Sequence, residues 1–465
     1  MMSPCITVYI TNYNYGKYIR QAVESVLNQT LQDFELFIID DGSTDNSKEI
    51  IESYASNPKI NIIYQKNKGL NITNNIALRL ANGKYIMRLD ADDYLEHTAL
   101  EDMTSLLEKE DNLGMVFPDY YLVDAKNEVI AEVKRHNFNE DVNLYDQPAH
   151  GACTVIRTES LKSVGGYDES YTCQDGYELW IKFIAKFKVT NIGKLLFFYR
   201  QHGANLTSNE NRILDTRRSI NDNFIINNDI KLPKTVAILP IRGTKLNGEF
   251  LFNTYLGEKR LIDIKIDMLL SSKLLDQIVI TSSEPTLKQH IEDNYKGHSK
   301  ISFYDRPAAL ERYNVTLMGT IDYLFAQAEI AKHNFEAFMV LPLEYIFLKG
   351  SVIDDAINAL EIFKSDSLLS VRPESTSLYQ HHGNGMVSIL EQAEFTQLER
   401  EALYKATGGV HLVKIDKYHE QQKTLPGKVG HIVVDSKTAH GIFSAFDLEV
   451  AKLLIKTDNL ILKPN

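Results

Sequence analysis

The feature that most constrains the fold is an alternation of short hydrophobic runs and amphipathic segments near the start of the chain. Buried β-strands are typically short runs rich in β-branched residues, and surface helices carry apolar residues at a spacing of three and four. The strand-like runs are residues 6–11, 34–39, 61–64 and 85–89, and the helix-like segments are residues 18–29, about 47–54 and 72–80. This order predicts an α/β fold with a parallel sheet covered by helices on both faces.

Polar residues follow three of these predicted strands directly. They are residues 11–14 (TNYN), 40–43 (DDGS) and 90–93 (DADD). Open α/β sheets place their ligands at the carboxyl ends of strands, so we expect the three groups to share one edge. Paired carboxylates suit Mg²⁺ or Mn²⁺, which leave positions for water and a substrate diphosphate, as in a nucleotide sugar. Alternatively, residues 41–44 form an ordinary turn and helix cap, and residues 90–93 a solvated acidic loop.

The alternation restarts after a polar stretch at residues 226–234. Further strands are predicted at residues 236–240, 277–281, 337–341 and 367–371, and further helices at residues 261–270, 352–363 and 445–455. We therefore expect two tandem α/β domains, residues 1–230 and 231–465.

Length and composition agree with this division and exclude several classes of protein. A chain of 465 residues holds about two or three domains at roughly 150 residues each. A net charge of −12 argues against nucleic-acid and anionic-membrane binding, because phosphate contacts need local positive charge. Three cysteines without a CxxC pair predict neither a disulfide framework nor a zinc site. With no signal-peptide pattern and no long apolar run, we expect a cytoplasmic protein without a membrane span.

Residues 4–210 resemble glycosyltransferase family 2, whose members are inverting transferases with the GT-A fold. The matching blocks are VYITNYN at 8–14, SVLNQT at 25–30, IDDGSTD at 39–45, NKG at 67–69, ANGKYI at 81–86 and DADD at 90–93. The resemblance implies transfer of a sugar from a nucleotide-diphosphate donor, a UDP-sugar above all, to a glycan or glycoconjugate hydroxyl. It also implies Mn²⁺ or Mg²⁺ as cofactor.

The same resemblance assigns roles to individual residues. Thr11, Tyr13 and Asp41, together with Asp40, would line the pocket for the base and ribose of the donor. Asp90 would face the ribose or the water ligands of the metal, and Asp92 would bind the metal directly. Asn74 stands where the family often has an arginine, which would make the donor diphosphate more dependent on the metal.

Two later blocks extend the resemblance to the acceptor side. Asp175 lies in QDGYELW and occupies the family's position for the base that takes the proton of the acceptor hydroxyl. The preceding Gln174 replaces the usual glutamate. The alternative for Asp175 is a carboxylate that stabilises a helix N-terminus. Trp180 is read as a core residue rather than an acceptor platform, and His202 as either a third metal ligand or a loop histidine.

Residues 235–455 resemble the acylneuraminate cytidylyltransferases through VAILPIRGTK at 236–245. In that family, a loop of this kind holds CTP phosphates, a role that would fall to Arg242 and Lys245; alternatively both are solvated loop charges. The metal-binding Asp-Ile-Asp of the family is replaced by Gly441-Ile442-Phe443, which leaves only Asp447. We therefore expect a degenerate, inactive domain. The alternatives are a bifunctional enzyme that also makes a CMP-sugar, and a binding or dimerisation module that produces a homo-oligomer.

Overall fold

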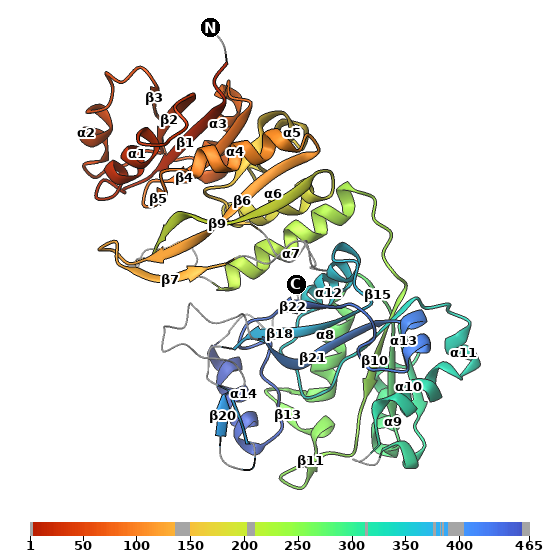
Figure 1. Ribbon diagram of the computed structural model, residues 1–465. Coiled ribbons are helices and arrows are strands. Elements are labelled where there is room, and N and C mark those ends of the chain that lie inside the picture. The colour runs from red at the N-terminus through yellow and green to blue at the C-terminus, as the bar shows by residue number, and fades with distance from the viewer. Residues whose placement is uncertain are drawn as a thin grey trace. The chain divides into compact units, whose positions relative to one another are not determined.

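The computed structural model of the chain (Figure 1) describes residues 3–134, 149–201, 210–311, 315–374, 378–381, 383, 386–388 and 404–457. The chain divides into two compact units. The first comprises Met1–Arg217 and Ser377–Glu401, and the second comprises Arg218–Thr376 and Ala402–Asn465. Each unit is described by itself below.

The first unit confirms the strands and helices predicted in its first 95 residues. Its strands are β1 (Ile6–Asn12), β2 (Phe34–Asp40), β3 (Ile60–Tyr64), β4 (Tyr85–Asp90), β5 (Tyr94–Leu95), β6 (Leu113–Val123), β7 (Val129–Val133), β8 (Val155–Arg157), β9 (Lys188–Arg200), β19 (Tyr379–His381) and β20 (Met386–Ser388). Its helices are α1 (Ile19–Leu27), α2 (Ser47–Glu52), α3 (Leu70–Leu80), α4 (Ala99–Lys109), α5 (Thr158–Ser163), α6 (Asp175–Ile184) and the first part of α7 (Glu210–Asn227).

The main sheet of this unit is mixed, which corrects the prediction of a parallel sheet. Its order is β3-β2-β1-β4-β8-β6-β9-β5, with β7 paired to β6. The strands β3, β2, β1 and β4 are parallel, whereas β8 is antiparallel to both β4 and β6. The hydrophobic runs of the first four strands predict their parallel pairing, but β8 has three residues and gives no such signal.

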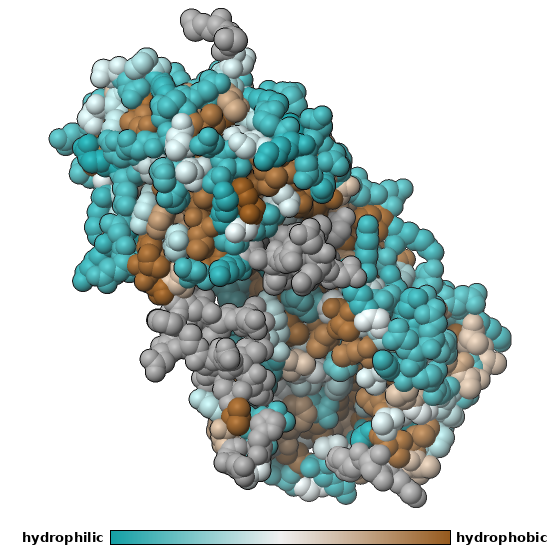
Figure 2. Space-filling view, viewed as in Figure 1, coloured by the Kyte–Doolittle hydropathy of each residue, from teal (hydrophilic) through white to brown (hydrophobic). Residues whose placement is uncertain are grey.

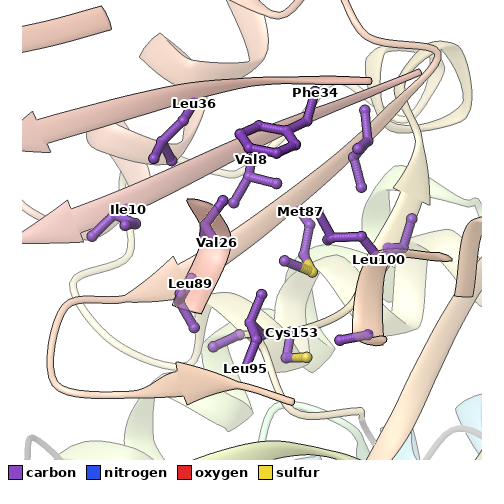
Figure 3. Packing of buried hydrophobic residues seen from close by; sticks show 14 of the residues in the cluster. Val8, Ile10, Val26, Phe34, Leu36, Met87, Leu89, Leu95, Leu100 and Cys153 are labelled. Carbon is purple, nitrogen blue, oxygen red and sulfur yellow. The ribbon is translucent and has the colours of Figure 1, made fainter. Parts of the chain in front are cut away.

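A buried core fixes the parallel strands against α1 and α4. Val8 and Met87 on the strands pack with Val26 of α1 and Leu100 of α4 (Figure 3), and none of the four is more than 1% exposed. Helix α1 buries Ile19, Ala22, Val23 and Val26, the spacing that one helical face requires. Much of the first unit's surface in the view of Figure 2 is hydrophilic. The packing of α1 and α4 on the sheet holds the carboxyl ends of these strands in fixed positions.

The second unit also confirms its predicted strands and helices. Its strands are β10 (Thr235–Pro240), β11 (Lys245–Leu246), β12 (Glu249–Phe250), β13 (Tyr255–Leu256), β14 (Lys259–Arg260), β15 (Leu275–Ser282), β16 (Ile301–Asp305), β17 (Ala337–Val340), β18 (Ser367–Pro373), β21 (Tyr404–Lys414) and β22 (Val429–Val433). Its helices are α8 (Leu261–Leu270), α9 (Pro285–Tyr295), α10 (Leu317–Phe325), α11 (Ala328–Ala331), α12 (Gly350–Ile362), α13 (Ile415–Gln421) and α14 (Ala445–Thr457).

The main sheet of the second unit has the order β16-β15-β10-β17-β21-β18-β22. Its first four strands are parallel and β21 is antiparallel, so this sheet is mixed as well. Among the described residues, no helix is both long and apolar enough to cross a bilayer.

Candidate active site

The register of the parallel strands confirms that the three polar strand ends lie side by side. Asn12 at the end of β1 pairs with Asp40 at the end of β2, and Thr11 pairs with Asp90 at the end of β4. The Thr11 hydroxyl donates a hydrogen bond of 2.9 Å to Asp90 Oδ1. Residues separated by up to 79 positions in the chain therefore form one polar edge.

Asp40 and Asp41 lie at this edge and accept hydrogen bonds from other residues of the chain. Asp40 accepts hydrogen bonds from Asn12 Nδ2 (2.7 Å) and from the backbone N–H of Ser43 (3.1 Å). Asp41 accepts from the backbone N–H groups of Lys68 (2.8 Å) and Gly69 (2.9 Å). Both carboxylates are buried, so they hold two loops in position beside the β1 end.

The ring of Tyr13 lies at the surface of this edge, with 47% of the residue exposed. The next residue, Asn14, has a positive φ of 61°, a conformation that asparagine tolerates better than most residues. Its side-chain oxygen accepts a hydrogen bond of 2.7 Å from the N–H of Thr44. The strained turn thus fixes the position from which Tyr13 projects.

A buried arginine connects the strand ends to Asp175. The Arg88 side chain is 6% exposed, and its Nε lies 3.1 Å from Asp90 Oδ1. Its Nη1 donates a hydrogen bond to Asp175 Oδ2 at 2.5 Å. Burial alone would lower the pKa of Arg88, but the charges of Asp90 and Asp175 raise the pKa well above its ordinary value. Arg88 is therefore a cation that holds both carboxylates.

The residues around Arg88 leave space for its guanidinium group. A Cβ atom at Gly151 would lie 2.8 Å from Arg88 Nη2, too close for any other residue without a shift. The Arg88 carbonyl accepts a hydrogen bond of 2.8 Å from the N–H of Cys153, a buried residue with a φ of 56°. Arg88 is not among the residues predicted from the sequence. The available signal was a charged residue inside an otherwise apolar strand, YIMRLD.

Asp175 begins α6, as the helix N-terminal alternative predicts, and its role as a base stays a prediction. Gln174 precedes it with a φ of 61° in the left-handed region, and its side-chain oxygen accepts from Arg217 Nε at 2.7 Å. The helix N-terminus favours a carboxylate there, while the ion pair directs Asp175 Oδ2 to Arg88. Among the described residues no hydrogen bond to Asp175 Oδ1 is formed, and the side chain is 16% exposed.

Acidic side chains crowd the turn after β4. Asp93 is 1% exposed, and its Oδ1 accepts from the N–H of Arg200 at 2.9 Å. Within the described part of the chain, its buried Oδ2 has no hydrogen-bond partner. Burial raises the pKa of Asp93 well above its ordinary value, and the charges of Asp92 and Asp90 raise it further. This excess of negative charge and the orphaned oxygen fit a cation held at Asp92.

A complete metal cage is not formed by the described residues, where no three His, Cys, Asp or Glu side chains group as a metal site. Mg²⁺ and Mn²⁺ sites of the kind expected here use one or two carboxylates and leave other positions to water and phosphate. His202, the predicted third ligand, lies outside the described residues.

Two further predictions concern side chains inside the first unit. Trp180 is 1% exposed and packs edge-to-face against Phe117 at 5.7 Å, which confirms it as a core residue. Asn74 is fully buried, and its Oδ1 accepts a hydrogen bond of 3.2 Å from Tyr9. At this position the side chain serves the packing of α3 on β1.

In the second unit, the predicted nucleotide-binding residues contact groups of the chain. Arg242 Nη2 donates to the carbonyl of Val315 at 3.1 Å, and Lys245 Nζ lies 4.7 Å from the centre of the Phe250 ring. Asp447 accepts hydrogen bonds from the Ser444 hydroxyl (2.8 Å) and the N–H of Phe443 (3.0 Å). Asp447 therefore caps the start of α14.

The first unit is thus an α/β unit whose acidic strand ends meet at one edge of the sheet. Residues 7–165 match the family model of glycosyl transferase family 2. An uncharacterized glycosyltransferase of Methanocaldococcus jannaschii is 30% identical over 209 residues, which cover 43% of this chain and 72% of that protein. The chain belongs to glycosyl transferase family 2.

Other relatives are much longer. The chondroitin synthase of Escherichia coli is 32% identical over 203 residues, 43% of this chain but 30% of that protein. The hyaluronan synthase of Pasteurella multocida is 32% identical over 209 residues, 43% of this chain and 21% of that protein. The chain thus spans less than a third of these two relatives. A crystal structure of Staphylococcus aureus TarS residues 1–349 with UDP-GlcNAc has a TM-score of 0.42 at 19% identity, covering 47% of this chain and 66% of that one.

Proposed function

We propose that the first unit is an inverting, metal-dependent glycosyltransferase. It moves a sugar from a nucleotide-diphosphate donor to a hydroxyl of a glycan or glycoconjugate. The observation that carries the proposal is the chain of ion pairs from Asp90 through buried Arg88 to Asp175. These ion pairs hold the Asp175 carboxylate in a fixed position relative to the strand ends. The carboxyl ends of the strands are where this fold places its ligands.

Asp175 is the proposed general base. Its Oδ1 accepts the proton of the acceptor hydroxyl while that oxygen attacks the anomeric carbon of the donor sugar. The new glycosidic bond forms as the bond from the anomeric carbon to the diphosphate oxygen breaks, and the configuration inverts. Arg88 prevents rotation of Asp175 by holding Oδ2, so that a productive geometry exists before the acceptor binds.

The donor's base and ribose would lie against Thr11, Tyr13, Asp40 and Asp41, beside the end of β1. A Mn²⁺ or Mg²⁺ ion held by Asp92, with His202 as a candidate additional ligand, would neutralise the charge of the departing diphosphate. UDP-sugars are the first donors to test. The names of the chondroitin and hyaluronan synthase relatives support a polysaccharide or glycoconjugate product.

A thermal-shift screen tests this proposal first. A donor that binds only the native state raises the melting temperature. We expect UDP with Mn²⁺ to raise the melting temperature, and Mn²⁺-dependent release of UDP from one UDP-sugar. Absence of any shift and any release across UDP-, GDP- and TDP-sugars would contradict the proposal.

The second unit is proposed to be an inactive, cytidylyltransferase-like domain. The capping role of Asp447 and the internal contacts of Arg242 and Lys245 support this. We expect no release of pyrophosphate from CTP and a nonulosonic acid, with or without Mg²⁺. Release that depends on Arg242 would instead establish a second, bifunctional activity.

Self-association through the second unit is a separate proposal. Phe443 and Phe446 are 66% and 75% exposed, and self-association would remove this apolar surface from water. Light scattering of the full chain should report a mass above that of the monomer. The double substitution Phe443→Ser and Phe446→Ser should return it to the monomer, and an unchanged mass would contradict the proposal.

A further inference from the structure

Two buried asparagines on α3 hold the loop that leads to Asp175. This α5–α6 loop comprises residues 165–174, all of which are described, and none of them lies in a helix or strand. Gly165 and Gly166 open the loop with φ values of 84° and 66°, left-handed conformations that glycine adopts without steric cost. Because the loop has no regular hydrogen-bond pattern of its own, its position depends on bonds to neighbouring elements.

Asn75 binds one residue of this loop at both of its backbone groups. Its Nδ2 donates to the carbonyl of Tyr167 at 2.8 Å, and its Oδ1 accepts from the N–H of Tyr167 at 3.0 Å. The same Nδ2 donates to Glu169 Oε1 at 2.9 Å. A Cβ atom at Gly166 would lie 2.6 Å from Asn75 Oδ1, so a larger residue there would displace this amide. One side chain thereby fixes both the position and the direction of the loop backbone.

Asn71 lies one turn earlier on α3 and binds the loop further along. Its Nδ2 donates to the carbonyls of Asp168 (2.6 Å) and Tyr171 (3.0 Å). Asn71 and Asn75 are four residues apart and therefore share one helix face, and both are buried. Asparagine is a poor helix former, and a buried helix face is ordinarily apolar. Two buried asparagines on one face are therefore explained by the loop that they bind, and we call them the asparagine clamp.

The clamped loop is bound in turn to α6, the helix that Asp175 begins. Glu178 lies in the first turn of α6. Burial raises the pKa of Glu178, and bonds from Lys182 and from the N–H of Asp168 oppose this rise. Asp168 therefore contacts α3 through its carbonyl, which Asn71 holds, and the start of α6 through its N–H.

Tyr167 brings the clamped loop beside the pair formed by Arg88 and Asp175. Tyr167 lines a small cavity together with Gly151 and Gly176. Burial raises the pKa of Tyr167 to about 12, with the charge of Arg88 opposing the rise and that of Asp175 adding to it. Both charged groups thus lie near the Tyr167 hydroxyl. A displacement of the loop would move a buried neighbour of both members of the ion pair.

We propose that Asn71 and Asn75 are positioning residues for Asp175. They fix the α5–α6 loop, and the loop determines where the first residue of α6 lies. Gln174, the last residue of the loop, has a φ of 61° and accepts a bond from Arg217, so the loop is held at both ends. Misplacing a reacting group by about 1 Å can cost about 10²-fold in rate. This inference rests on the proposed function, because it assigns the clamp to the reaction of Asp175.

The test compares Asn75→Leu and Asn71→Leu with the wild type as full-length proteins. Leucine keeps the branched shape of asparagine without its hydrogen-bonding groups. Gln29→Met is the matched control, because Gln29 is a buried amide of the same unit that does not contact the loop. Its Nε2 donates to the carbonyls of Ser25 (2.9 Å) and Glu96 (2.7 Å). All three variants lose buried hydrogen bonds, so each should melt at a lower temperature.

Two readouts separate positioning from stability. Hydrogen exchange of the amides of residues 165–174 should rise about tenfold in both leucine variants and stay unchanged in Gln29→Met. At saturating UDP-sugar with Mn²⁺, the leucine variants should release UDP about tenfold to hundredfold more slowly, with a donor KM within about twofold of the wild type. Gln29→Met, assayed below its melting temperature, should release UDP at the wild-type rate. If Asn75→Leu does not fold, Asn71→Leu, which removes fewer bonds, carries the test.

Several results would overturn the inference. Release of UDP at the wild-type rate by the leucine variants would remove the link from the clamp to Asp175, and so would an equal loss of rate in Gln29→Met. Unchanged exchange of the loop amides would show that the asparagines do not hold the loop. A raised donor KM with an unchanged kcat would assign them to donor binding instead. Failure of the proposed function would appear differently, as a wild type that releases no UDP while loop exchange still rises in the variants, and it would remove the reaction that the clamp serves.

Discussion

The two units begin with the same arrangement of strands and use their strand ends differently. Each main sheet contains four parallel strands, β3-β2-β1-β4 in the first unit and β16-β15-β10-β17 in the second. Numbered among themselves by chain order, both sets lie in the order third, second, first and fourth, and an antiparallel strand follows the fourth. In the first unit, Arg88 joins two carboxylates that come from different elements. In the second, buried Arg306 pairs with Glu311, five residues further along the chain, and Asp447 caps a helix.

This difference shows that shared topology does not carry chemistry by itself. In the second unit, Arg306 bonds only to the chain's own groups among the described residues, the carboxylate of Glu311 and the carbonyl of Ile241. In the first unit, Asp175 Oδ1 and the buried Oδ2 of Asp93 have no hydrogen bond within the described residues. The predictions below test whether Asp175 and Asp92 do chemistry that Asp447 of the second unit does not.

The largest expected effect is that of Asp175→Asn. An amide cannot take the acceptor proton, so the rate of transfer should fall by about 10² to 10⁴. The measurement is the initial rate of sugar transfer at saturating donor, with melting temperature as a check on folding. Asp447→Asn in the second unit is the matched control and should transfer at the wild-type rate. Transfer by Asp175→Asn at the wild-type rate would eliminate Asp175 as the base.

Arg88→Met should destabilise the first unit strongly. It leaves Asp90 and Asp175 without their buried counter-charge, a loss that typically costs about 3–5 kcal/mol. Trp180 is the chain's single tryptophan and lies in the first unit's core, so its fluorescence during urea unfolding reports on this unit.

Gly151→Ala tests the same contact more gently, because its Cβ would meet Arg88 Nη2. We expect a loss of about 1–3 kcal/mol, as for other overpacked sites. Gly176→Ala, whose Cβ would meet nothing closer than 3.7 Å, is the control. Equal stability of Gly151→Ala and the wild type would show that the guanidinium is not confined there.

The second unit should show a pH dependence that the first does not share. Lys265 is fully buried, and this burial lowers its pKa from 10.5 to about 7. Between pH 7 and 10.5 the unfolded chain binds a proton that the folded unit does not, so stability rises with pH across that window. The expected slope is about 1.4 kcal/mol per pH unit.

Urea unfolding followed by far-ultraviolet circular dichroism, with Trp180 fluorescence to separate the first unit, measures this slope. Lys265→Met should remove this slope. Lys273→Met is the control, because Lys273 is exposed and lies eight residues further along the chain, and it should retain the slope. A second unit equally stable at pH 7 and pH 9.5 would show that Lys265 stays charged.

The smallest expected effect is that of Asp447→Ala. Loss of a helix cap costs about 0.5–2 kcal/mol. We expect a modest decrease in the stability of the second unit and no change in transfer rate. A tenfold loss of transfer in this variant would contradict the division of roles between the units.

Sequence patterns predicted the parallel strands and helices because each carries its own periodicity, as in β1 and α1. They also predicted the shared edge of Asp40 and Asp90, since parallel strands end on one side. The mixed sheet was missed because β8 is too short to have a pattern. The Arg88–Asp175 pair joins residues 87 positions apart, and only the folded chain brings them together. Asp447 follows Ser444 by three residues, which is the spacing of a capping box, so the sequence could have predicted the capping role of Asp447.

The most direct test of the central claim, that the acidic strand ends of the first unit form a metal-dependent transferase centre, is release of nucleoside diphosphate by the full chain. Wild-type protein and Asp92→Asn would be compared on a panel of UDP- and GDP-sugars, with Mn²⁺ and with chelator. We predict release by the wild type that requires Mn²⁺ and falls by at least a hundredfold in Asp92→Asn. Release at the wild-type rate by Asp92→Asn, or release that chelator leaves unchanged, would contradict the account.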